Sequence, residues 1–147
     1  MVLIDVAEKQ HATASGPIVE HRRDAVSWLI AKGHREIAFI TGSLDSPPAW
    51  ASFRLQGRFG ACRHYLRDAL IAEGKWSPAS AAAVSQLLTR GETFTAMVAS
   101  SDDMAIGAIR QLHEAASPSP GAVSVIGFDD VAIAPYIVPS SPACVFR

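Results

Sequence analysis

The chain has 147 residues, of which 49% are hydrophobic and 18% charged, a composition that predicts one globular domain and excludes a disordered protein. Its 13 basic and 14 acidic residues leave a formal charge of −1, which argues against a nucleic-acid binder that relies on a basic surface. No apolar run approaches the roughly 20 residues of a membrane span, and Met1 to Asp5 carries no basic leader. We therefore expect a cytoplasmic protein with no membrane partner. Cys62 and Cys144 have neither metal-ligand spacing nor a disulfide framework, as is usual in a reducing compartment.

Short apolar runs alternate along the chain with segments of helical periodicity. The apolar runs predict strands at residues 2–4, 37–40, 94–99 and 122–128, with a further brief strand within 69–74. The helical pattern predicts helices over residues 22–32 and 55–69. Gly33 ends the first of these, Ser77-Pro78 begins another, and Ser100 or Ser101 caps the last. The predicted inward positions are Val26, Leu29 and Ile30; Phe59, Cys62, Leu66 and Ala69; Ala81, Val84, Leu87 and Leu88; and Met104, Ala105, Ala108, Ile109 and Leu112.

Strands separated by helices imply βαβ units, so the expected fold class is α/β, a three-layer, doubly wound and mostly parallel sheet. In such sheets ligands bind beyond the carboxyl ends of the strands. The sequence places polar residues at these ends, namely Asp5, Thr41 to Ser43, Ser100 to Asp103, and Asp129 with Asp130. We therefore predict a ligand site at the carboxyl edge of the sheet.

Catalytic and cofactor motifs are missing from the sequence. It contains no GxGxxG, P-loop, HExxH or GxSxG pattern, and its five histidines show no metal-ligand spacing. We therefore expect a protein that is not an enzyme and has no cofactor or metal. An Mg²⁺-dependent enzyme stays as an alternative, because carboxylates at strand ends are ligands that Mg²⁺ accepts.

A binding site for a sugar-like polyol is the alternative that the residue types favour. Carboxylates accept hydrogen bonds from ligand hydroxyls, arginine donates a planar fork of them, and tryptophan offers a flat apolar face. The candidate ligand-binding residues are Asp5, Arg54, Trp76, Ser101, Asp102 and Asp129. Structural roles are open for three of them: Asp102 as a charge at a helix start, Trp76 in packing, and Asp129 in a turn.

Five segments together resemble the effector-binding core of LacI/GalR-type transcriptional regulators. They are AVSWLIAKGHREIAFITG (25–42), RLQG (54–57), GKWS (74–77), TAMVASSDDMAIGAI (95–109) and VSVIGFDD (123–130). The resemblance implies two α/β lobes around a cleft, as in periplasmic sugar-binding proteins. It also implies effector contacts from Arg54 and Asp129, a further contact from Asp5, and stacking by Trp76. Ser101 and Asp102 stand where the family has Asn-Asp.

The resemblance also implies how the chain is organised. Residues 1–15 would be a residual strand and crossover from a first lobe, and residues 16–147 would be the second lobe. The family's helix-turn-helix head would precede Met1, so operator DNA would be reached only through a head domain that this chain lacks. We expect a small-molecule effector, a homodimer, and weak effector binding by the chain alone. A free-standing flavodoxin-like domain for small-molecule binding or signalling is the alternative.

Overall fold

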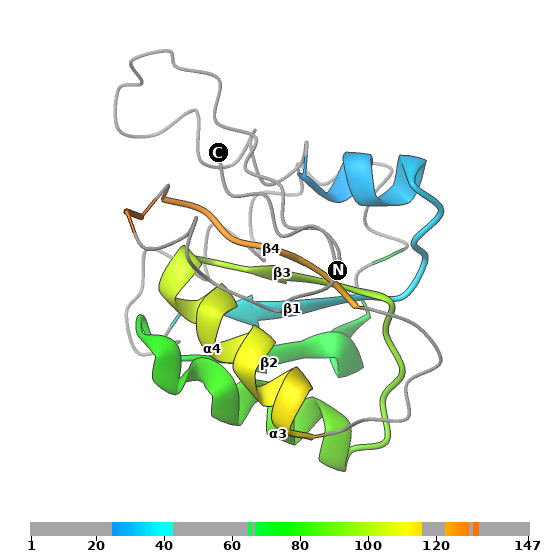
Figure 1. The fold of residues 1–147 in the computed structure, drawn as a ribbon. Coiled ribbons are helices and arrows are strands. Elements are labelled where there is room, and N and C mark those ends of the chain that lie inside the picture. The colour runs from blue at the N-terminus through cyan, green and yellow to red at the C-terminus, as the bar shows by residue number, and fades with distance from the viewer. Residues whose placement is uncertain (1–24, 43–64, 66, 116–122, 130, 133–147) are drawn as a thin grey trace.

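The computed structural model describes residues 25–42, 65, 67–115, 123–129 and 131–132, and the fold is stated for these residues. Four parallel strands form one sheet in the order β2-β1-β3-β4 (Figure 1). Their bounds are Ile37–Thr41 for β1, Ile71–Glu73 for β2, Ala96–Ala99 for β3 and Ser124–Ile126 for β4. The predicted parallel α/β fold is confirmed, while the strand predicted at residues 2–4 lies outside the described residues.

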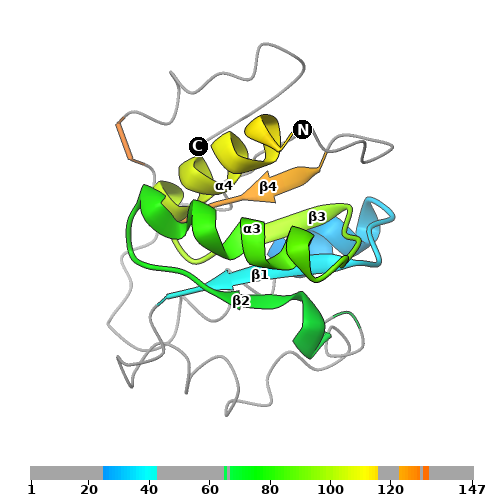
Figure 2. The ribbon, with the colours of Figure 1, turned by 90° about the horizontal axis from the view of Figure 1, so that it is seen from below.

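Helices cover both faces of the sheet, which gives the three layers that the strand-helix alternation predicts. A helix over residues 25–31 lies on one face, and α3 (Ala81–Thr89) and α4 (Asp102–Glu114) pack side by side on the other (Figures 1 and 2). Two short 3-10 helices complete these segments: η2 (Asp68–Leu70) precedes β2, and η3 (Pro78–Ser80) leads into α3. Within the described segments, no helix combines the length and apolar character that crossing a bilayer requires.

The side chains of β1 and β3 alternate between two hydrophobic cores, because successive residues of a strand point to opposite faces. In β1, Ile37 and Phe39 pack toward the 25–31 helix, whereas Ala38 and Ile40 pack toward α3 and α4. All five residues of β1 are buried, as a central strand covered on both faces requires. The larger core lies between the sheet and the α3–α4 pair.

Two helix boundaries follow the signals in the sequence. Gly33 ends the first helix with a φ of +97°, and its backbone N–H donates to Ile30 O at 2.9 Å. Ser101 is the N-cap of α4, since its hydroxyl accepts from the Met104 backbone N–H at 3.3 Å. Both predictions are confirmed. Of the five inward positions predicted for α4, four are buried and Leu112 is only partly buried.

Two predictions for the helices are wrong in detail. The helix predicted over 55–69 does not continue through Arg67, whose backbone is extended at φ −81° and ψ 132°; most of its other residues lie outside the described part. Ala81 is only partly buried, and Ala83 takes the inward position with Val84 and Leu87. Ala83, Val84 and Leu87 are spaced i, i+1 and i+4 and so share one face of the helix, whereas Ala81 lies to one side of that face.

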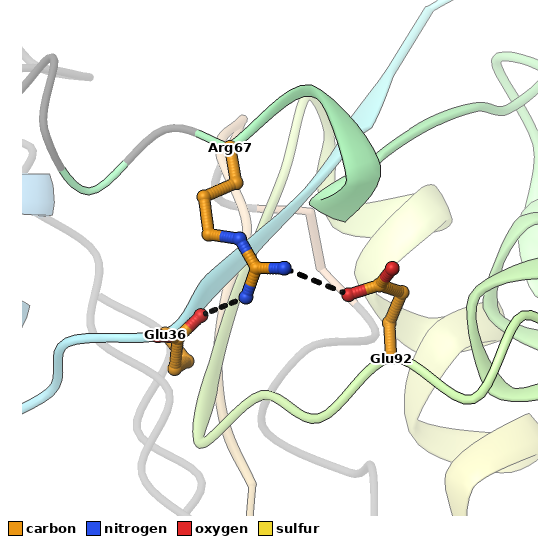
Figure 3. A network of polar contacts seen from close by, with 3 residues as sticks. All are labelled: Glu36, Arg67 and Glu92. Atoms are coloured by element: carbon orange, nitrogen blue, oxygen red, sulfur yellow. Dashed lines mark hydrogen bonds and ion pairs between the residues drawn. The ribbon is translucent and has the colours of Figure 1, made fainter.

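An ion-pair network joins three segments at the amino end of the sheet. The Arg67 guanidinium donates to Glu36 at 2.8 Å and to Glu92 at 3.4 Å (Figure 3). The hydrogen bond to Glu36, followed by the charges of both carboxylates, raises the pKa of Arg67. These residues precede β1, β2 and β3, so the network lies at the end of the sheet opposite to the predicted ligand site.

Candidate functional site

The loops that follow the four strands meet at the carboxyl edge of the sheet. Backbone hydrogen bonds link neighbouring strand ends there: Gly74 N donates to Thr41 O at 2.9 Å, and Ser100 N donates to Ile40 O at 3.1 Å. The Ser100 hydroxyl donates to the same Ile40 carbonyl at 3.1 Å. The connection that leaves β1 leads to β2 on one side, whereas the connection that leaves β3 leads to β4 on the other side, so the direction of the connections reverses between β1 and β3. A ligand site is expected at such a point in an open α/β sheet.

Trp76 is the large hydrophobic side chain that stands out among the described residues, since 49% of its surface is exposed. It lies in the loop after β2, and its indole ring rests on Gly42, the residue that follows β1. A Cβ atom at position 42 would overlap the ring, so glycine is required for this close approach. The result is an indole ring that packs against the backbone and stays half exposed at the carboxyl edge.

Ser80 holds the loop that carries Trp76. Its hydroxyl accepts from the Lys75 backbone N–H at 2.9 Å and donates to the Lys75 carbonyl, so both backbone groups of one residue bind one side chain. Ser80 is 1% exposed, and it also fills the space that a side chain at Gly74 would need. This role of Ser80 could not be predicted from the sequence, because a serine beside an alanine-rich helix carries no distinguishing signal. Ser77 caps η3 through a 3.3 Å hydrogen bond from Ala79 N, as predicted.

Ser101 and Asp102 begin α4 directly after β3, and both are buried, with 6% and 2% of their surfaces exposed. The Ser101 hydroxyl is engaged as the N-cap acceptor for Met104. The Asp102 carboxylate accepts from the Val131 backbone N–H at 3.0 Å, and its own backbone N–H donates to Phe128 O at 2.8 Å. Asp102 therefore joins the start of α4 to the loop after β4.

Asp129 lies in that loop and is exposed. Its φ of +128° falls in a region that residues other than glycine rarely adopt, although aspartate tolerates positive φ better than most. Asp129 thus fits the turn role left open in the sequence analysis, and its carboxylate is also accessible to a ligand.

Four of the six predicted site residues lie at one edge of the sheet: Trp76 in the loop after β2, Ser101 and Asp102 at the start of α4 after β3, and Asp129 in the loop after β4. The other two, Asp5 and Arg54, lie outside the described residues. Among the residues that are described, no group of His, Cys, Asp or Glu is arranged to hold a metal ion. An exposed indole ring can stack on a sugar ring, and an exposed carboxylate can accept hydrogen bonds from sugar hydroxyls.

Residues 26–143 match the model of the periplasmic binding protein-like domain family. The chain is 55% identical over 121 residues to the HTH-type transcriptional regulator AscG of Escherichia coli, covering 80% of this chain and 35% of that protein. Over 119 residues it is 34% identical to the transcriptional regulator GalR of Escherichia coli, covering 78% and 34%.

The fold matches solved structures of the same kind. A sugar-binding transcriptional regulator of the LacI family from Escherichia coli, solved with phosphate, aligns with a TM-score of 0.72 and 49% identity. The alignment covers 86% of this chain and 46% of that one. The Escherichia coli transcriptional repressor ascG aligns with a TM-score of 0.69 and 50% identity over the same shares.

The fold and the edge site thus define a periplasmic binding protein-like domain, and the chain belongs to that family, in the form found as the effector-binding core of LacI/GalR-type transcriptional regulators. The resemblance stated from the sequence is confirmed. The chain spans about a third of the length of the curated relatives it matches: the alignments cover 35% of AscG and 34% of GalR. These relatives are transcriptional regulators rather than enzymes.

Proposed function

We propose that this chain supplies one wall of the effector pocket of a LacI/GalR-type regulator, and that the effector is a sugar or a related polyol. The observation that carries the proposal is the half-exposed Trp76 side chain, packed on Gly42 at the same sheet edge as the exposed residue Asp129. The names of similar proteins agree with it: one is a sugar-binding regulator, and another is the regulator CelR in complex with cellobiose.

Each candidate residue has a distinct part in the proposed pocket. Trp76 stacks on an apolar face of the sugar ring, and Asp129 accepts hydrogen bonds from its hydroxyls. Ser101 lies at the edge beside them, while Arg54 and Asp5 add a donor fork and a further acceptor. Asp102 belongs to the same group of residues, and its buried carboxylate supports the pocket wall through the loop after β4.

In the whole protein we propose that effector binding shifts the balance between two arrangements of the effector-binding core, and that this changes operator binding by a separate head domain. The protein performs no chemistry on the ligand and acts in the cytoplasm, where operator DNA is found. A homodimer is part of the proposal, supported by the similarity to a structure of the dimeric Lac repressor, which is 29% identical. Residues 16–147 form the second lobe of the core.

Titration calorimetry of the chain with neutral mono- and disaccharides, cellobiose among them, tests the proposal. We expect saturable binding of at least one sugar, weakened about fivefold or more by Trp76→Ala and largely retained by Trp76→Phe, because phenylalanine keeps a flat face. Trp28→Phe is the matched control, since Trp28 packs beside the core on the opposite side of the sheet. Equal sugar affinity in the wild type and Trp76→Ala would contradict the proposal.

A further inference from the structure

Asp102 has little surface to offer a ligand, because only 2% of it is exposed. It nevertheless lies between β3 and the loop after β4 that carries Asp129. We propose that Asp102 is a positioning residue, whose role is to hold the Asp129 carboxylate in the effector pocket; the inference rests on the proposed function of that pocket.

The contacts of Asp102 lie on both sides of Asp129 in the chain. On the amino-terminal side, the Asp102 backbone N–H donates to Phe128 O at 2.8 Å. On the carboxy-terminal side, Oδ2 of Asp102 accepts from the Val131 backbone N–H at 3.0 Å. One residue thus fixes the loop immediately before and two residues after Asp129. A hydrogen bond to a charged acceptor is about twice as strong as a neutral one, which suits the carboxylate to this task.

The packing of Gly127 adds a third link between Asp102 and this loop. A Cβ atom at position 127 would overlap Oδ1 of Asp102, so the loop backbone passes directly against the carboxylate. Asp129 itself has a φ of +128°, a conformation that persists only when the surrounding structure restrains it. The hydrogen bonds and the close packing of Asp102 provide that restraint.

The first test does not depend on any ligand. Amide hydrogen exchange of Val131 is measured in the wild type, in Asp102→Ala, and in Asp103→Ala as the matched control. Asp103 occupies the same first turn of α4 but is exposed, so its removal changes the helix-start charge equally. We expect exchange about tenfold faster in Asp102→Ala alone. Equal exchange in all three proteins would overturn the proposal.

Asp102→Asn keeps the test informative if Asp102→Ala folds poorly. The amide oxygen of asparagine can still accept from Val131 N–H, so this variant is expected to retain most of the protection of Val131. The contradicting result is an Asp102→Asn protein in which the Val131 amide exchanges as fast as in an unfolded chain while the rest of the sheet stays protected. It would show that the charge of Asp102, and not its hydrogen bond, is needed, and would overturn the proposed geometry.

The second test is a double-mutant cycle on sugar affinity. If Asp102 acts through Asp129, Asp102→Ala weakens binding by about tenfold in the wild type and has little effect once Asp129→Ala is present. A direct ligand contact, or a purely structural role, predicts the same effect of Asp102→Ala in both backgrounds, and that result overturns the proposal. If the wild type binds no sugar, the proposed function fails, whereas the Val131 exchange still decides the role of Asp102.

Discussion

The indole ring of Trp76 rests on Gly42 so closely that no side chain fits between them. Trp76 follows β2 and Gly42 follows β1, so this contact joins two neighbouring strand ends. The glycine lets the ring approach the backbone while about half of the Trp76 surface, 49%, stays exposed. This arrangement presents an aromatic surface without burying it.

Gly42→Ala should displace the ring with little loss of stability, because the exposed half of Trp76 lets it swing toward solvent. We expect a shift in Trp76 fluorescence emission, measured with Trp28 and Trp50 replaced by phenylalanine, and sugar affinity reduced about fivefold. The same measurements on the background without Gly42→Ala serve as the reference. Unchanged emission together with unchanged affinity would contradict this role of Gly42.

Ser80→Ala should cost about 1–3 kcal/mol of unfolding free energy, because it leaves the partly buried N–H and C=O groups of Lys75 without their hydrogen-bond partner. It should also make Trp76 more accessible to acrylamide quenching in the single-tryptophan background. Ser85→Ala is the control: its hydroxyl bonds Ala81 O at 3.4 Å within α3 and is remote from the loop. Similar quenching in both variants would show that Ser80 does not hold the Trp76 loop.

Gly107 marks the point where α4 crosses η3. A Cβ at this position would overlap the Pro78 carbonyl, which is backbone and cannot rotate away. Gly107→Ala should therefore destabilise the protein by about 1–3 kcal/mol in denaturant unfolding, although alanine is the better helix former. Gln111→Ala, one turn further along α4, is expected to be close to neutral. A stabilised Gly107→Ala protein would show that the two segments pack less closely.

His34 makes stability depend on pH at the amino end of the sheet. Partial burial lowers its pKa from the usual 6.5, and Nδ1 lies 2.9 Å from the Thr95 hydroxyl oxygen. Because the folded state holds the proton less tightly than the unfolded state, His34 contributes stability above about pH 6.5 that is lost as the pH falls through the lowered value. Thermal midpoints between pH 7.5 and 5 should fall less steeply in His34→Gln than in the wild type. His113→Gln, at an exposed position of α4, is the control.

The parallel sheet could be predicted from the sequence because strands buried on both faces consist of continuous apolar runs. Residues 37–40 and 96–99 illustrate this, since every one of them is buried. The fine phase of the helices could not be predicted in the same way. The buried face of α3 contains Ala83 and not Ala81, and the spacing of small apolar residues in this alanine-rich segment does not distinguish the two.

The candidate site was predictable to the extent that polar residues follow strand ends. The sequence does not reveal how each of these residues is used. Asp102 and Asp103 are adjacent and chemically identical, yet one is buried and the other exposed. Only the path of the loop after β4 decides that Asp102 meets Val131. Ser80 likewise acquires its role from the fold of residues 74–77 and not from its neighbours in sequence.

Amide chemical-shift mapping during titration with a neutral sugar shows where on the sheet a sugar binds, and the proposed position is the carboxyl edge. We predict saturable shifts at Gly42, Trp76 and Asp129 and none at the amino-end residues Glu36 and Glu92. Shifts confined to the amino end, or none at any sugar concentration, would contradict the account.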